Sequence, residues 1–199
     1  MSRFHEDIPC FSSLQIYHNC LMRRKDNHEP LGNPPIVARE LVAERFNKYR
    51  QAWTESDMCR RLKNILASSA TNLEMTKIVA VSLGRLSYFC NDRPPRHAYQ
   101  HAMVLTMRDW LAERNGTDAP CYVQDPDYDD VDKSVLAEHK VQVLEDPMAW
   151  LEIDDTSIVV SIASNVPSKE IVADIARPAV VIWNRVGNDD YDQKGKPAL

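Results

Sequence analysis

The chain lacks the cysteine pattern of a disulfide framework or of a four-cysteine zinc site. Its five cysteines are an odd number, are scattered, and never form a CxxC pair. Disulfide-rich secreted domains and zinc ribbons both depend on paired cysteines at set spacings. A reducing compartment is therefore the simplest expectation, which means the cytoplasm and also the nucleus. The cysteines are Cys10, Cys20, Cys59, Cys90 and Cys121.

Long apolar runs are also absent. No stretch of the 199 residues approaches the roughly 18–20 apolar residues that cross a bilayer. The first ten residues, MSRFHEDIPC, contain no apolar segment of the kind that forms a signal peptide. The sequence thus predicts no membrane association. The net charge of −5 argues against a general nucleic-acid binder, although a local basic patch is compatible with this net charge.

Glycine is scarce, with five glycines against twelve prolines, which favours rigid turns over flexible glycine linkers. Gly84 stands alone, so the chain has no G-x-G-x-x-G motif of the usual dinucleotide-binding type. What is present is an apolar fraction of 44%, enough to form an ordinary globular core. The length fits one domain with an added helical part.

The first 70 residues predict an arm followed by two helices. Residues 1–33 show no sustained periodicity and read as an irregular arm, whereas residues 34–70 have a helical pattern. Thr54 stands three residues before Asp57, which resembles a capping box and predicts a second helix over about 55–68. The residues that line one face of the first helix are Val42, Phe46, Tyr49 and Trp53.

Short apolar runs then alternate with helical patterns, as in a parallel α/β fold. The predicted strands are 77–82, 121–124, 141–144, 157–162 and 179–183. The predicted helices are 97–114, 129–138, a short turn after Asp146-Pro147, and 168–175. We therefore expect a Rossmann-like parallel sheet of about five strands with flanking helices over 71–186. A helical extension precedes this domain, and a flexible tail covers 187–199.

In an open parallel sheet, ligands bind beyond the carboxyl ends of the strands, where the strand order reverses. We expect the polar residues at these ends to meet in one crevice, which suggests a nucleotide-like or adenosylmethionine-type cofactor. Alternatively, Gly84 only makes a turn and Asp125 only holds a loop before Pro126. The candidate residues are Ser82, Gly84 and Arg85 after the first strand, Asp125, Asp127 and Tyr128 after the second, and Ser161, Ser164 and Asn165 after the fourth.

Two groups of residues invite a metal hypothesis. The aspartates from Asp125 to Asp132 fail the EF-hand template, because position six is Asp130 and position twelve is Leu136. We expect one of these aspartates to cap the helix that follows. His97 and His101 share a helix face and are weak zinc candidates, since HAYQH lacks the Glu of H-E-x-x-H.

Basic and aromatic residues near the crevice have similar alternatives. The arginines there suit phosphate or carboxylate groups, but pairing with the nearby acidic loop is the favoured interpretation. The tryptophans and Cys121 are expected to fill the core rather than to stack bases or to react. The arginines are Arg85, Arg93 and Arg96, and the tryptophans are Trp53, Trp150 and Trp183.

Three segments are informative in combination, namely KIVAVSLGRLS at 77–87, YVQDPDYDDVDKSVLAEHKVQVLEDP at 122–147, and SIVVSIASNVPSKEIVADIARPAVVI at 157–182. In this order and spacing they resemble the SRR-like domain family, named for sensitivity to red light reduced, and the likeness is greatest to its short fungal members. The resemblance spans about residues 55–185. The family is linked to circadian and light responses in plants and to cytoskeletal or stress phenotypes in yeast. It thus implies a regulatory or accessory protein that acts through protein partners.

This chain departs from the family at two points. Ser82-Leu83-Gly84 stands where the family commonly has Gly-Leu-Gly. Ser161–Asn165 stands where many members carry Pro-His-Cys, so a haem role of that His-Cys pair does not carry over. Beside the regulatory interpretation, two alternatives remain. They are a transferase-like enzyme that uses the strand-end crevice and a small-molecule cofactor, and a metal or haem protein.

Overall fold

The computed structural model describes residues 37–69, 72–87, 96–162 and 164–184. The chain divides into Met1–Ile36 and Val37–Leu199, and every described residue belongs to the second unit. The predicted arm, the predicted tail and the candidate Arg93 lie outside the described residues. The helices are α1 (Arg39–Thr54), α2 (Asp57–Ser69), α3 (Arg96–Asn115), α4 (Asp130–Glu138), α5 (Met148–Leu151) and α6 (Ser168–Ile175).

Five strands form one parallel sheet, which confirms the predicted fold class. The strands are β1 (Lys77–Val81), β2 (Cys121–Gln124), β3 (Gln142–Val143), β4 (Ser157–Ser161) and β5 (Val180–Trp183). Their order is β3-β2-β1-β4-β5, so the chain first builds outward from β1 and then returns to its other side. Val81 pairs with both Gln124 and Ser161, so the carboxyl ends of β1, β2 and β4 are level.

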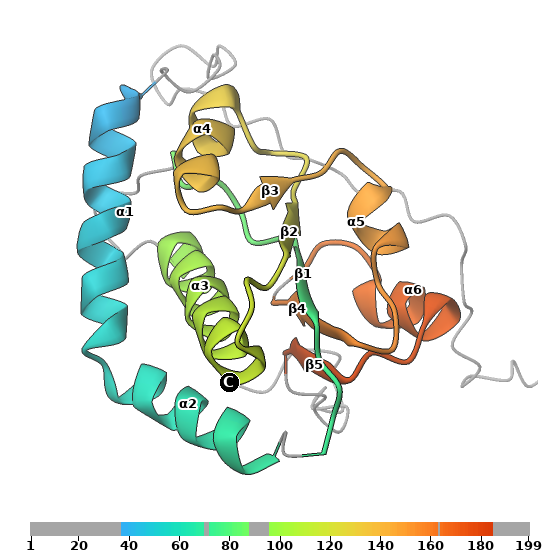
Figure 1. Cartoon of the computed structure of the whole chain (residues 1–199). Coiled ribbons are helices and arrows are strands. Elements are labelled where there is room, and N and C mark those ends of the chain that lie inside the picture. The colour runs from blue at the N-terminus through green and yellow to red at the C-terminus, as the bar shows by residue number, and fades with distance from the viewer. Residues whose placement is uncertain (1–36, 70–71, 88–95, 163, 185–199) are drawn as a thin grey trace, which may run out of the picture. The chain divides into compact units, whose positions relative to one another are not determined.

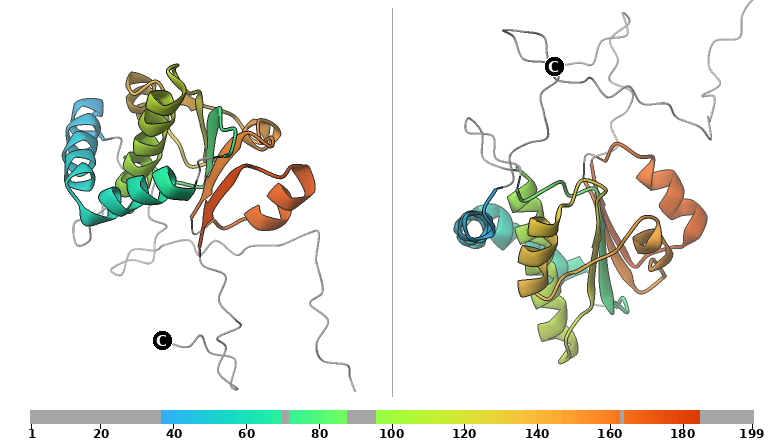
Figure 2. Two further views of the ribbon diagram at one scale, coloured as in Figure 1. Left: turned by 60° about the horizontal axis from the view of Figure 1, so that its bottom comes forward. Right: turned by 90° about the horizontal axis from the view of Figure 1, so that it is seen from above.

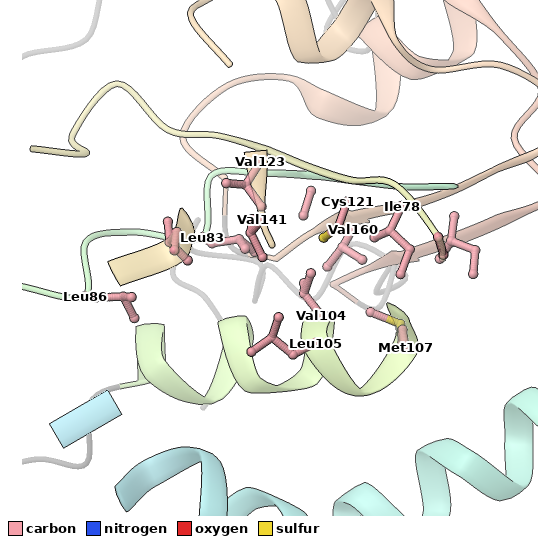
Figure 3. Close-up of a cluster of buried hydrophobic side chains, with 14 of the residues drawn as sticks. Ile78, Leu83, Leu86, Val104, Leu105, Met107, Cys121, Val123, Val141 and Val160 are labelled. Carbon is pink, nitrogen blue, oxygen red and sulfur yellow. The ribbon is translucent and has the colours of Figure 1, made fainter. Parts of the chain in front are cut away.

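Helices cover both faces of the sheet (Figures 1 and 2). α3 and α4 lie on one face, α5 and α6 lie on the other, and α1 packs outside α3 and α4. β1 serves both sides, because neighbouring residues of a strand point to opposite faces. Ile78, labelled in Figure 3, and Ala80 join the core on the α3 side, and Val79 and Val81 join the core around Trp150.

The predicted inner face of α1 is largely confirmed. Val42, Phe46 and Trp53 are buried, and Tyr49 packs half-buried against the same core. The Trp53 indole Nε1 donates a hydrogen bond of 2.9 Å to the Thr106 hydroxyl of α3. This bond matters because a buried indole N–H without an acceptor would cost stability. α1 is therefore held to the α/β core by packing and by a specific polar contact.

The cap of α2 differs from the prediction. Thr54 is the last residue of α1, and its hydroxyl donates to the Arg50 carbonyl one turn back. Ser56 takes the cap position instead, because its Oγ accepts a 3.1 Å hydrogen bond from the Cys59 N–H. The capping box at Thr54 and Asp57 is therefore wrong. α1 includes Thr54, and α2 begins at Asp57, two residues later than predicted, with Ser56 as the hydroxyl that caps it.

Several strand ends are shorter than predicted. β1 ends at Val81 because Ser82 has a φ of 59°, outside the extended conformation of a strand. The Ser82 N–H still donates to the Gln124 carbonyl, so this residue continues the ladder for one bond. β4 ends at Ser161, and β3 contains only two paired residues. In each case the residues that do not pair lie at the end of a strand, where the chain turns into a loop.

Candidate functional site

The candidate site lies at the carboxyl ends of β1, β2 and β4. Between β1 and β4 the strand order reverses, which is the position where open α/β sheets bind ligands. The structure shows how far each predicted residue takes part in this region. The residues form two hydrogen-bonded groups, one over β1 and β2 and the other over β1 and β4.

Gly84 and Asp125 are brought together, although they are 41 positions apart. The Gly84 N–H donates a 2.7 Å hydrogen bond to Asp125 Oδ2, and the other carboxylate oxygen accepts from the Asp127 N–H at 3.0 Å. Gly84 has a φ of 76°, and a Cβ there would lie 1.9 Å from His97 Nδ1. Gly84 therefore permits close approach of the loop to α3, and Asp125 ties this loop to the end of β2.

Arg85 bonds to acidic residues at the start of α4. Its guanidinium pairs with the Asp129 carboxylate, and its Nε lies 3.5 Å from Asp132 Oδ2. The Ser87 N–H donates a 2.7 Å bond to Asp132 Oδ1. Asp129 also caps α4 in a capping box with Asp132, as the sequence predicted for one of these aspartates. Arg85 pairs with the acidic loop, so the pairing interpretation of this residue is confirmed.

The pKa values of the two carboxylates in the capping box, Asp129 and Asp132, shift in opposite directions. Complete burial raises the pKa of Asp132. Burial alone would also raise the pKa of Asp129, but the Asp132 backbone N–H and the Arg85 guanidinium stabilise its charged form and lower the pKa. Asp129 is therefore the anion that pairs with Arg85. The arrangement fixes the β1–α3 loop against the start of α4.

His101 and Tyr128 form a buried pair on the α3 side of the loop. His101 Nε2 lies 2.8 Å from the Tyr128 hydroxyl, and its Nδ1 lies 2.7 Å from the His97 carbonyl. Burial lowers the pKa of His101 to about 4 and raises the pKa of Tyr128 well above its usual value. Both groups are therefore neutral near pH 7. The Nδ1–H donates to the carbonyl, and Nε2 accepts from the phenol.

The serines after β1 and β4 form the second group. The Ser164 hydroxyl donates a 2.9 Å hydrogen bond to the Ser82 hydroxyl, which joins the two loops at the point of strand reversal. Ser161 is buried and donates to the Ser168 hydroxyl of α6 at 2.9 Å. Asn165 follows on the same loop as Ser164 and is exposed. Eight of the nine predicted residues thus lie on the strand-end loops and Ser161 ends β4, although the nine do not share one cavity.

An open pocket of about 350 Å³ lies beside the second group, between the ends of β4 and β5 and the start of α6. Seven of its nine lining residues were not predicted as site residues, and one of them, Trp183, was expected to fill the core but is only half-buried at the pocket. Ser168 and Lys169 begin α6, and Trp183 ends β5, where the Lys169 ammonium lies 5.7 Å from the centre of the indole ring. Their positions beside a strand end and a helix start could have identified them. The lining residues that were predicted are Ser161 and Ser164.

The structure also places the candidate metal ligands and the reactive groups. Among the described residues, no three His, Cys, Asp or Glu side chains gather in a way that could hold a metal ion. Both ring nitrogens of His101 contact protein acceptors or donors, and His97 Nδ1 lies 3.0 Å from the Leu83 carbonyl. Cys121 is buried, and burial raises its pKa to about 12, so it fills the core as predicted.

Taken together, the parallel sheet, its strand order and its strand-end loops define a Rossmann-like α/β protein. The chain belongs to the SRR1 domain family, whose model matches residues 42–197. The family resemblance drawn from the sequence is thereby confirmed. The match begins within α1, so α1 from Val42 onward and all of α2 lie inside the matched region.

Comparison with curated proteins and with solved structures found no match to this chain. Within the part of the chain that the structure describes, no helix is both long enough and apolar enough to cross a membrane.

Proposed function

We propose that this SRR1 domain protein is a regulatory or accessory protein that acts by binding protein partners. The observation that carries this proposal is the bonding of the strand-end groups to one another. Asp125 accepts from the Gly84 N–H, Arg85 pairs with Asp129, and His101 bonds Tyr128. Groups used in this way hold loops in place, and a substrate would have to break these bonds to use them.

Exposed apolar side chains on the helices give further support. The side chains of Met58 and Ile65 on α2 are 68% and 59% exposed, and Leu151 on α5 is 65% exposed. Single exposed apolar residues are common, but several on helix surfaces are suited to contact with another protein. The family resemblance implies the same kind of role.

A two-stage binding experiment tests this proposal. A photo-crosslinking residue at an exposed helix position of the full chain first recovers a partner from cells, and the purified partner is then titrated against the chain. We expect saturable binding that is unchanged by Ser164→Tyr, a substitution that fills the strand-end pocket. If binding does not saturate, or if Ser164→Tyr abolishes it, the proposal fails.

A second candidate function is the binding of a nucleotide-like or adenosylmethionine-type molecule, by an enzyme of the transferase kind. The pocket beside β4, β5 and α6 favours it, because it lies next to the strand-reversal point, on the β4 side, and combines hydroxyls, Lys169 and the face of Trp183. A volume of about 350 Å³ is at the small end of the range for ligand pockets.

A thermal-shift screen with adenosylmethionine, NAD(P) and nucleotides tests the second candidate, because a ligand that binds only the native state raises the unfolding temperature. A rise with one ligand that disappears in Ser164→Tyr would support it. No rise with any ligand at millimolar concentration would count against it.

The proposal also places the protein in the cytoplasm or the nucleus. Cys59 and Cys121 are free and buried in the described structure, which fits a reducing compartment. Fluorescence microscopy of the tagged full chain checks this placement, and secretion of the chain would contradict it.

A further inference from the structure

The charge of the chain is unevenly distributed along its sequence. Residues 37–69, which contain α1 and α2, carry seven Lys or Arg against four Asp or Glu. Residues 72–184, which contain the sheet and its remaining helices, carry ten against eighteen. The two outer helices are thus positive, although the chain as a whole has a net charge of −5. Such an asymmetry attracts acidic partners to one part of the surface.

α2 combines this positive charge with exposed apolar groups. Its inner side is formed by Cys59, Leu62 and Leu66, which pack against the core. Met58, Arg61 and Ile65 follow i, i+3, i+7 spacing and form a separate exposed stripe, called the α2 stripe below. Two exposed apolar side chains therefore lie on the same helix face as a guanidinium.

The other basic residues of α2, Arg60 and Lys63, lie on different faces of the helix from the α2 stripe, because residues one or two positions apart do not share a face. Lys63 is exposed, and Arg60 is exposed and pairs within the helix with Asp57 at 2.7 Å. Within the described residues, no ion pair involves Arg61 or Lys63. Arg61 thus keeps its charge available beside Met58 and Ile65.

From this arrangement we infer that the α2 stripe docks an acidic, amphipathic segment of a protein partner. Apolar side chains of the segment would cover Met58 and Ile65, and a carboxylate of the segment would pair with Arg61 between them. A guanidinium suits carboxylates because it presents paired donors in a planar fork. The inference rests on the proposed function, since it names the surface and the chemistry of the partner that this function requires.

The test uses the full chain and a labelled amphipathic peptide of Glu and Leu with one apolar stripe, measured by fluorescence anisotropy. We expect saturable binding that weakens about tenfold or more in the double variant Arg61→Glu, Ile65→Gln, and that weakens as salt is raised. The same peptide with Gln in place of Glu should bind at least several-fold more weakly. Circular dichroism checks that the variant, whose changes are exposed, keeps its fold.

A matched control makes the same kinds of change elsewhere, an exposed cation to Glu and an exposed aliphatic side chain to Gln. The double variant Lys140→Glu, Leu151→Gln alters an exposed ammonium and an exposed leucine away from α2, and it should retain full affinity. Vesicles that contain phosphatidylserine and a DNA duplex serve as the other anionic probes. Equal loss in both double variants, or tighter binding to vesicles or DNA than to the peptide, overturns the inference.

The inference and the proposed function can fail separately. If the purified partner binds the chain with the same affinity in wild type and in Arg61→Glu, Ile65→Gln, the α2 stripe is not the docking surface, although partner binding stands. If no partner binds while the peptide does, the proposed function fails and the α2 stripe is only an acidic-peptide binder.

Discussion

At the scale of single residues, Gly84 is the position where backbone conformation and packing are most tightly combined. Its positive φ is a conformation that residues with a side chain adopt only at a cost. The His97 ring also occupies the space that a Cβ would need. Gly116 provides a natural comparison, because its φ is also positive but nothing lies within 4 Å of its would-be Cβ.

We therefore predict that Gly84→Ala lowers the free energy of unfolding by about 2–4 kcal/mol, from backbone strain and overpacking together. Gly116→Ala should lower it by only about 1 kcal/mol, because only the backbone cost remains. Urea denaturation of both variants measures the two values. Equal losses would show that the contact with His97 contributes nothing.

His101 gives a second prediction at this scale, on pH. Burial lowers its pKa in the folded state to about 4, whereas the unfolded chain has a value near 6.5. Between these values the unfolded chain binds more protons, so acid favours unfolding. The stability linked to His101 is present above about pH 6.5 and is lost as the pH falls toward 4. The gap corresponds to about 3 kcal/mol.

The measurement compares the unfolding free energy of wild type and His101→Gln between pH 7 and 4. The loss on acidification should be smaller in the variant by an amount on the order of 3 kcal/mol. His139, whose pKa is also lowered by burial, titrates in both proteins and cancels in the comparison. If the unfolding free energy changes with pH by the same amount in both proteins, His101 is not a buried neutral group in the folded state.

At the scale of elements, the start of α2 is where sequence pattern and structure disagree. The sequence offers two hydroxyls, at Thr54 and Ser56, and the capping-box pattern favours the first. α1 extends through Thr54 because Trp53 is buried against α3, so the chain can turn only after that residue. Tertiary packing therefore decides which hydroxyl caps α2.

This difference gives a prediction with its own control. Ser56→Ala removes an acceptor for the Cys59 N–H and should lower stability by about 1 kcal/mol. Thr54→Ala removes only a hydroxyl that donates back within α1, and it should be neutral or slightly stabilising, because Ala favours helices. Thermal unfolding separates the two variants. If Thr54→Ala lost more stability than Ser56→Ala, the result would support a capping box at Thr54 and Asp57 instead.

The elements themselves could be predicted from the sequence because continuous apolar runs mark strands covered on both faces. The strand-end rule also identified Gly84 and Asp125 as neighbours. It could not predict their 2.7 Å bond, because a bond across 41 positions depends on the level ends of β1 and β2. The pocket beside Trp183 was missed because its shape depends on how the β4–α6 loop turns.

At the scale of the whole molecule, the described structure separates an inner network from an outer surface. The loops after β1 and β2 are joined by Asp125, Asp129 and Asp132, and these bonds fix the edge of the sheet. α2 instead presents exposed apolar and basic groups. We therefore propose that the strand ends stabilise the fold and that the helical surface contacts the partner.

Hydrogen–deuterium exchange of the full chain, with and without its purified partner, tests this assignment most directly. The account predicts that the partner protects amides of α2 from exchange, and that amides of 82–87 and 164–167 exchange as they do in the free chain. Protection confined to 82–87 and 164–167, with α2 unchanged, would contradict it.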